Sequence, residues 1–92
     1  MKQKDDMSII SLLVRSKKRI NVLKSLEKEN KIPSKISKDI DDNSNHVSKY
    51  LKTLKEAELV ECLNEEDKRY RFYAITDKGK YYLNKVEHNY KD

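Results

Sequence analysis

The stretch that decides the fold is SNHVSKYLKTL, residues 44–54. Its apolar residues Val47, Leu51 and Leu54 follow one another at spacings of four and three, which places them on one face of a helix. Ser44 is of a residue type that caps helix N-termini, because its hydroxyl accepts a hydrogen bond from a backbone N–H group in the first turn. We therefore predict that this stretch is helical, with Ser44 as the N-cap.

The opposite face of this predicted helix, residues 44–57, carries hydrogen-bonding groups and almost no apolar surface. A helix buried along one side and polar along the other suits the major groove of DNA, where base edges present donors and acceptors. Asn45 can pair with adenine, and His46 or Lys49 can donate to guanine. The candidate DNA-contacting residues of this helix, with Ser48 and Lys52 suited to phosphate, are Ser44, Asn45, His46, Ser48, Lys49 and Lys52.

The composition limits the classes of protein to which the chain can belong. Its 92 residues have room for a single hydrophobic core and therefore for one domain. Charged residues make up 40% of the chain, and the net charge of +5 favours a polyanionic partner such as nucleic acid. The one cysteine, Cys62, excludes an intrachain disulfide and a metal site built from several cysteines.

Other classes of function lack their sequence signals. There is no supported arrangement of Ser, His and Asp, no phosphate-binding glycine loop and no metal-binding cluster, so we expect neither an enzyme nor a bound cofactor or metal. The longest apolar run, residues 9–14, is too short to cross a bilayer, and the mixed-charge N-terminus is unlike a signal peptide. We expect a cytoplasmic protein with no membrane partner.

A helical pattern precedes the central stretch. Residues 1–7 are expected to form a flexible tail, and residues 8–90 a single domain. The basic cluster at residues 15–19 interrupts the apolar periodicity, and we expect a bend or a helix break near Ser16. This cluster either contacts phosphate or forms a solvated polar face.

A second helix is predicted to begin at Pro33, because proline is favoured in the first turn of a helix. Two isoleucines spaced four residues apart form its inner face. The polar residues 41–44 make a turn that leads into the central helix, so the two helices form a helix-turn-helix. Ser34 and Lys35, at the start of the second helix, are further candidates for DNA contact.

The segment after the central helix has the pattern of an antiparallel hairpin. Residues 59–63 and 70–75 are rich in β-branched and aromatic residues, and a charged loop at residues 64–69 separates them. Thr76 then caps a last helix, in which the only glycine, Gly79, lies on the apolar face and permits close packing. We predict a mainly α-helical fold with a small two-stranded β wing.

These elements, in this order, resemble small archaeal winged-helix transcriptional regulators related to the MarR and ArsR families. The landmarks are RSKKRINVL at 15–23, PSKI at 33–36, HVSKYLK at 46–52, ELVECL at 58–63 and YAITDKG at 73–79. The resemblance implies a winged helix-turn-helix fold, with helix 44–57 in the major groove and the wing, residues 64–71, at the minor groove or backbone. The wing residues that would contact DNA are Lys68, Arg69 and Arg71.

The chain departs from the pattern of this family at two positions. Glu58 stands where such proteins usually carry a glycine that ends the helix in a left-handed conformation. Glu58 must either adopt that conformation, at a cost of about 1 kcal/mol, or end the helix differently. Tyr70 stands where a glycine usually precedes the arginine that is Arg71 here, which predicts a differently shaped wing.

The resemblance also implies a homodimer, since such regulators usually place two recognition helices one turn of DNA apart, about 34 Å. The candidate interfaces are residues 9–14 and the last helix, and the apolar residues of that helix are Tyr81, Tyr82, Val86 and Tyr90. The predicted function is a sequence-specific double-stranded-DNA-binding transcriptional regulator, most simply a repressor. The alternatives are a winged helix for protein–protein contact in the transcription or replication machinery and a non-specific architectural DNA binder. The sequence does not indicate whether a small-molecule effector is sensed.

Overall fold

The computed structural model describes residues 6–89 of the chain. These residues form, in order, α1 (Asp6–Val14), α2 (Lys17–Lys28), α3 (Pro33–Ile40), α4 (Ser44–Glu56), β1 (Val60–Cys62), β2 (Tyr73–Ile75) and α5 (Asp77–Asn89). The two strands pair antiparallel, with Val60 opposite Ile75 and Cys62 opposite Tyr73. The predicted mainly α-helical fold with a helix-turn-helix and a two-stranded wing is confirmed.

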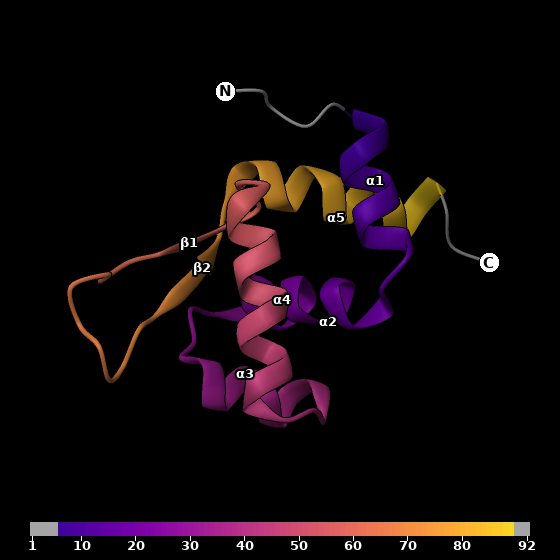
Figure 1. Cartoon of the computed structure of the whole chain (residues 1–92). Coiled ribbons are helices and arrows are strands. Elements are labelled where there is room, and N and C mark those ends of the chain that lie inside the picture. The colour runs from indigo at the N-terminus through magenta and orange to yellow at the C-terminus, as the bar shows by residue number, and fades with distance from the viewer. Residues whose placement is uncertain (1–5, 90–92) are drawn as a thin grey trace.

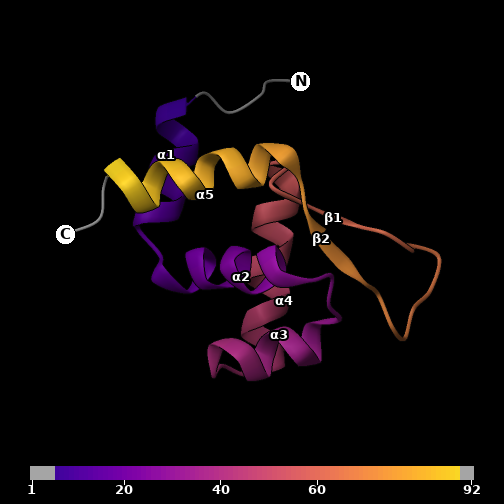
Figure 2. The ribbon, with the colours of Figure 1, turned by 180° about the vertical axis from the view of Figure 1, so that it is seen from behind.

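The helices are arranged around α2 and α4. In Figure 1, α4 stands upright in front, α5 lies across its upper end, α3 lies across its lower end, and the two strands project to the left. Figure 2 shows from behind that α2 crosses between α5 and α3. The helix α2 contacts α3, α4 and α5, while α1 packs against both α2 and α5. The helix-turn-helix therefore rests on α2, and its outer side is left uncovered.

The core consists of the periodic apolar residues. Val47, Leu51 and Leu54 of α4 are at most 2% exposed, so the predicted inner face is buried. Burial of a side chain of this size contributes about 2 kcal/mol. Other buried residues come from every helix and from the start of the wing: Leu13, Leu23, Leu26, Ile36, Leu59 and Leu83.

The predicted N-cap of α4 is wrong by one residue. Asn43 is the N-cap, since its backbone is extended and its Oδ1 accepts a hydrogen bond from the N–H of His46 at 2.9 Å. Ser44 is the first residue of the helix. Both types cap helices well, and Asn43 has the advantage that its own N–H donates to Asp42 at 2.7 Å. The helix ends at Glu56, close to the predicted end.

The N-terminal region differs from the predicted tail. The helix α1 begins at Asp6, so Asp6 and Met7 are helical, while residues 1–5 lie outside the described residues. The predicted break near Ser16 is confirmed. Ser16 is extended between α1 and α2, and its Oγ accepts a hydrogen bond from the N–H of Arg19 at 3.3 Å.

The end of α4 adopts the left-handed conformation that glycine usually supplies. Glu58 has φ of 67°, which is the first of the two alternatives predicted for it. The N–H of Glu58 donates to the carbonyl of Lys55, and the N–H of Leu59 donates to the carbonyl of Leu54, each at 2.9 Å. This pair of hydrogen bonds is the Schellman motif. The helix α3 ends in the same way at Asp41, whose φ is 57°.

The strands of the wing are shorter than predicted. Residues 70–72 were expected in the second strand, but only one more backbone hydrogen bond follows the strands, from the N–H of Leu63 to the carbonyl of Phe72 at 2.8 Å, and the side chain of Asn64 makes the next contacts. Asn64 Oδ1 accepts from the N–H of Phe72, and Asn64 Nδ2 donates to the carbonyl of Tyr70, each at 2.8 Å. On the other side of β2, Lys31 forms a single antiparallel bridge with Tyr73 through backbone hydrogen bonds of 3.1 and 2.8 Å.

Gly79 lies where the wing meets α5. The predicted cap is confirmed, because the N–H of Gly79 donates to Thr76 Oγ1 at 2.9 Å. A Cβ atom at position 79 would lie 2.1 Å from the carbonyl oxygen of Leu59 and 2.7 Å from Cγ1 of Ile75. Only glycine permits this approach of α5 to the start of β1.

Most of the apolar residues assigned to a dimer interface are buried within the chain. Ile9, Leu13, Tyr82 and Val86 are at most 6% exposed, because α1 packs against α5. In this conformation they are not available to a partner. The large apolar side chains of α1 and α5 that remain exposed are Met7, Val14 and Tyr81; Tyr90 lies outside the described residues.

Candidate nucleic-acid interface

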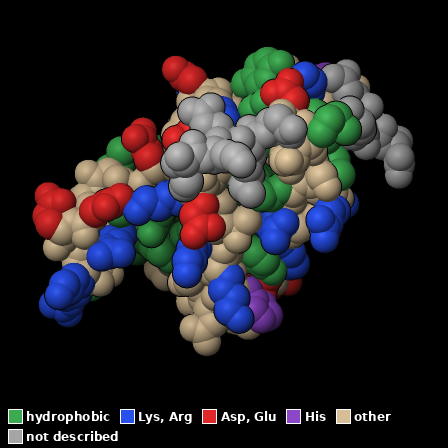
Figure 3. Space-filling model, turned by 45° about the horizontal axis from the view of Figure 1, so that its top comes forward, with side chains coloured by type: hydrophobic (Ala, Val, Ile, Leu, Met, Phe, Trp, Pro, Cys, Tyr) green, Lys and Arg blue, Asp and Glu red, His purple; other side chains and the backbone are tan. Residues whose placement is uncertain are grey.

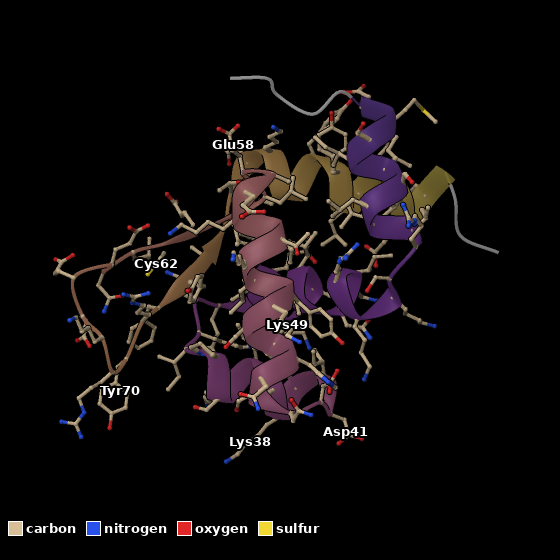
Figure 4. All side chains as sticks on the ribbon, in the orientation of Figure 1. Lys38, Asp41, Lys49, Glu58, Cys62 and Tyr70 are labelled. Carbon is tan, nitrogen blue, oxygen red and sulfur yellow. The ribbon has the colours of Figure 1, made fainter. Side chains whose placement is uncertain are left out.

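The polar face of α4 is exposed as predicted. The side chains at positions 44, 45, 46, 48, 49 and 52 are all exposed, while the apolar residues between them are buried. Figure 4 shows Lys49 on α4 between Glu58 at one end of the helix and Asp41 beyond the other. The helix therefore presents two chemically distinct faces, and the polar one points away from α2.

Four side chains on this face have no polar partner among the described residues. Among the described residues, Asn45, Ser48, Lys49 and Lys52 make no side-chain hydrogen bond and no ion pair. Unpaired amide, hydroxyl and ammonium groups on a helix surface are available to base edges and phosphates. His46 is different, because its Nδ1 lies 2.9 Å from Asp42 Oδ1.

The turn before α4 is held by Asp42, which the sequence analysis did not single out. Its carboxylate binds the ring of His46, the backbone N–H of Asn43 at 2.7 Å and the hydroxyl of Tyr50 at 3.0 Å. Lys18 of α2 lies 3.8 Å away. These partners, with His46 first, hold the pKa of Asp42 down at about 2, and burial raises the pKa of Tyr50. The half-buried Tyr50 is thus tied to the turn by its hydroxyl.

The candidates on α3 are also exposed. Ser34 and Lys35 lie in the first turn of α3, directly after Pro33. Neither makes a side-chain hydrogen bond or ion pair within the described part of the chain. Lys38, in the last turn of the same helix, projects from it in Figure 4. The helix α3 can therefore add cationic and hydroxyl groups beside α4.

The basic side chains of the wing are exposed and partly preorganised. Lys68, Arg69 and Arg71 are all exposed. Asp67 Oδ1 accepts the N–H groups of Arg69 and Tyr70 at 2.8 and 2.9 Å, and Arg71 Nε donates to the Asp67 carbonyl at 2.9 Å. The two N–H donors are also the main reason that the pKa of Asp67 is lowered. Asp67 thus shapes the loop that carries the cations.

Acidic residues beside the wing cations are partly neutralised. Glu65 pairs with Lys55 of α4 at 2.6 Å, and this hydrogen bond lowers the pKa of Glu65 and raises that of Lys55. The pair also links the wing to α4. Figure 3 shows Lys and Arg side chains over the wing, at the left, and over the middle of the molecule.

The wing carries exposed apolar side chains that the sequence analysis assigned to strands. Leu63, Tyr70 and Phe72 are 51%, 55% and 44% exposed. The guanidinium of Arg69 lies 5.7 Å from the ring centroid of Tyr70. All three residues lie outside β1 and β2, in the part of the wing that projects from the helices (Figure 1).

The basic cluster at residues 15–19 proves to be partly structural. Lys18 Nζ donates to the carbonyl of Ile40 at 3.3 Å, and an Arg19 guanidinium nitrogen donates to the carbonyl of Leu12 at 2.8 Å. These two residues therefore join α2 to the turn and to α1. Arg15 and Lys17 are exposed.

Lys31 is a buried residue that the sequence analysis did not identify as part of the structure's interior. Lys31 is 5% exposed, and its ammonium donates to the carbonyl and hydroxyl of Ser25 at 2.7 and 3.0 Å and to Asp39. This contact is the first cause of the lowered pKa of Asp39. The network joins α2 to α3 beneath the wing, and a charged residue in a short connection carries no sequence signal of burial.

The described residues contain neither a metal-binding cluster nor a membrane-spanning helix. Within residues 6–88, no group of three or more His, Cys, Asp or Glu side chains is placed to hold a metal ion. Cys62 is half-buried, with Sγ 3.9 Å from Asn64 Oδ1. None of the described helices has the length and apolar character needed to span a membrane.

Comparisons with known proteins agree with this geometry. Residues 15–91 match the winged helix-turn-helix family. A structure of a mutant of ZitR from Lactococcus lactis superimposes with a TM-score of 0.70 at 21% identity, over 83% of this chain and 53% of that one. This likeness shows a shared fold, and the chain spans about half the length of that protein. No curated protein gives a significant match. The family match and the fold support DNA binding and transcription regulation, and the chain belongs to the winged helix-turn-helix family.

Proposed function

We propose that this chain is a sequence-specific double-stranded-DNA-binding transcriptional regulator of the MarR and ArsR type that acts as a repressor in the cytoplasm. The observation that carries the proposal is the exposed face of α4, where Asn45, Lys49 and Lys52 are unengaged among the described residues. A helix that docked another protein through this face would carry more apolar or aromatic groups. The net charge of +5 adds long-range attraction to a polyanion.

In this proposal the first two turns of α4 read base edges. The 13 residues of α4 make a helix about 20 Å long, and the major groove is about 12 Å wide, so its N-terminal half reaches deepest. Asn45, His46 and Lys49 contact bases, whereas Ser48 and Lys52 contact phosphate. The exposed Ser44, Ser34 and Lys35 flank these residues and contact the DNA backbone.

The wing supplies a second point of attachment. Lys68 and Arg69 reach the adjacent minor groove or the phosphates, while Arg71, which is bound to the Asp67 carbonyl, holds the loop and adds positive charge. The pairing of Glu65 with Lys55 reduces the repulsion that an acidic loop would otherwise exert on DNA.

A homodimer completes the proposal, because one domain makes few base contacts. Met7 and Val14 of α1 and Tyr81 of α5 are 66%, 47% and 54% exposed and are the apolar groups that these two helices offer a partner. A two-fold arrangement would place two α4 helices one helical turn of DNA apart, about 34 Å.

One alternative function is supported by a specific observation. Leu63, Tyr70 and Phe72 give the wing exposed apolar surface, which fits a winged helix that docks a protein of the transcription or replication machinery. The outcome of a DNA-binding experiment separates the two functions.

The test is selection of binding sites from random duplexes with the purified full chain at physiological salt. Enrichment of a palindrome with half-sites about one turn apart supports a dimeric, sequence-specific regulator. Strong binding without enrichment indicates a non-specific architectural protein. If no duplex binds, DNA binding is excluded, and a pull-down with and without Phe72→Ser tests the docking alternative.

Two variants then separate base reading from phosphate contact. Asn45→Ala should cost about 1–3 kcal/mol at the selected site and relax sequence preference at one position. Lys52→Ala should weaken binding to all sequences similarly and reduce the salt dependence by about one counterion. Equal losses on every sequence for both variants would contradict the assignment of Asn45.

A further inference from the structure

His46 differs from its neighbours Asn45 and Lys49 because its ring is already bound within the chain. Its Nδ1 lies 2.9 Å from Asp42 Oδ1, and its side chain is 53% exposed. The side chain of Asp42 is only 12% exposed. One nitrogen of the imidazole is thus committed to the turn, while the ring remains accessible to DNA.

The contacts of Asp42 decide which nitrogen of His46 carries the hydrogen atom. Besides His46, the carboxylate binds the N–H of Asn43, the hydroxyl of Tyr50 and, at 3.8 Å, the ammonium of Lys18. All of these groups are donors, and with His46 they keep the pKa of Asp42 at about 2. An ionised carboxylate has no hydrogen to donate, so Nδ1 of His46 must be the donor.

A neutral imidazole that carries its hydrogen on Nδ1 has a lone pair on Nε2. Among the described residues, Nε2 of His46 has no hydrogen-bond partner. It is therefore an acceptor on the face of α4 that meets DNA. This reverses the role expected from the sequence alone, in which His46 donates to guanine.

We propose that Asp42 is a positioning residue that makes His46 a hydrogen-bond acceptor in the major groove, so that the operator carries adenine or cytosine opposite His46. Adenine N6 and cytosine N4 are the amino donors of the major groove. Guanine offers only the acceptors N7 and O6 there, and thymine offers O4 and a methyl group. The inference rests on the proposed DNA-binding function and assigns a base class to one residue of that interface.

No side chain in the described part of the chain is bound to Nε2 of His46. The Tyr50 ring lies 6.4 Å from the His46 ring, centroid to centroid, and its hydroxyl is bound to Asp42. Two charged groups of α2 face this turn. Lys18 is bound to the carbonyl of Ile40, and the charge of Arg19 opposes the rise in the pKa of Tyr50. The acceptor role belongs to the neutral form of an imidazole, so both experiments are carried out at about pH 8.

The first experiment measures the tautomer without DNA. The full chain, labelled with ¹⁵N, is examined at about pH 8 by a long-range ¹H–¹⁵N spectrum of its histidine rings, with His46→Gln to assign the signals. We expect the Nδ1–H form for His46 in the wild type and a shift toward Nε2–H in Asp42→Ala, which removes the acceptor of the Nδ1 hydrogen. Asparagine is not used at position 42, because the oxygen that faces Nδ1 also accepts the N–H of Asn43, and an amide oxygen could replace it there. Asp41→Asn is the control, because it removes the neighbouring carboxylate with a residue that also tolerates a left-handed backbone, and it should leave the tautomer unchanged. A predominant Nε2–H form in the wild type would overturn the inference.

The second experiment is the random-duplex selection at about pH 8 with the wild type, His46→Ala, Asp42→Ala and Asp41→Asn. The wild type and Asp41→Asn should prefer adenine or cytosine about tenfold at one position of each half-site. His46→Ala and Asp42→Ala should lose that preference while they keep preferences elsewhere in the half-site. A wild-type preference for guanine or thymine at the position lost in His46→Ala, or an unchanged preference in Asp42→Ala, overturns the base assignment. Absence of enrichment in every sample overturns the proposed function and the base assignment together, whereas the tautomer is decided by the spectrum alone.

Discussion

The turn that leads into α4 and the end of α4 share one backbone feature but are held by different forces. Asp41, which ends α3 and begins the turn, and Glu58, which follows the end of α4, both have a left-handed backbone without being glycine. At the first end, side-chain hydrogen bonds converge on Asp42. At the second end, Thr76 donates to the Glu58 carbonyl at 2.7 Å, and Gly79 lies against the carbonyl of Leu59.

The two ends of α4 are therefore held in place by different kinds of contact. The turn depends on charge and on the protonation of Asp42, because its contacts are hydrogen bonds to a carboxylate. The base of the wing depends on volume, because its contacts are a close approach of backbone atoms. Changes of charge should therefore act at the turn, and changes of size at the wing base.

The largest effect is expected at the wing base. Gly79→Ala should lower the free energy of unfolding by about 3 kcal/mol, because the added methyl would meet the Leu59 carbonyl, which is backbone and cannot rotate away. Urea denaturation measures the loss. Lys80→Ala, on the exposed neighbouring residue of α5, is the control and should change stability by less than about 0.5 kcal/mol. A loss for Gly79→Ala no greater than that of the control would show that the wing base tolerates volume.

An intermediate effect is expected at the turn on acidification. The pKa of Asp42 is about 2 in the folded chain, below the value of about 3.9 for an unfolded aspartate, so the stabilisation is complete above about pH 4 and is lost as the pH falls toward 2. Asp39, Glu65 and Asp67 also have lowered pKa values and act in the same direction. Urea midpoints between about pH 5 and pH 2 should therefore fall more steeply for the wild type than for Asp42→Asn. Parallel curves would mean that the turn does not depend on this carboxylate.

The smallest effects compare the two left-handed residues directly. Glu58→Gly should raise the free energy of unfolding by somewhat less than 1 kcal/mol, since it removes backbone strain but makes the unfolded chain more flexible. Asp41→Gly should raise it less, because aspartate tolerates the left-handed region better than glutamate. The exposed pairing of Glu58 with Lys78 at 3.3 Å is lost in the first variant and contributes little. Thermal unfolding of both variants ranks them, and a larger gain for Asp41→Gly would reverse the comparison.

Much of the fold could be predicted because its signals are local. The spacing of Val47, Leu51 and Leu54 identified the buried face of α4, and Thr76 and Ser16 mark helix starts by their own side chains. The end of the wing strands could not be predicted in the same way. It involves Asn64, whose side-chain amide binds the N–H of Phe72 and the carbonyl of Tyr70, eight and six residues away.

The candidate DNA-binding site likewise contains residues that local patterns predict and a residue whose role depends on tertiary contacts. The exposure of Asn45, Lys49 and Lys52 follows from helical periodicity once the opposite face is buried. The role of Asp42 does not follow, because its partners come from α2, the turn and two successive turns of α4. An aspartate in a polar turn has the same sequence signature whether it is solvated or surrounded by donors.

The sequence by itself determined the order of the elements, the two faces of α4 and the exposed positions that are candidates for DNA contact. These depend on periodicity, capping and turn chemistry, which act over a few residues. Only the tertiary structure decided that Ile9 and Val86 are core residues, that Lys31 is buried, and that His46 is held by Asp42. Each of these depends on groups brought together by helix packing, and no local pattern of residues encodes that proximity.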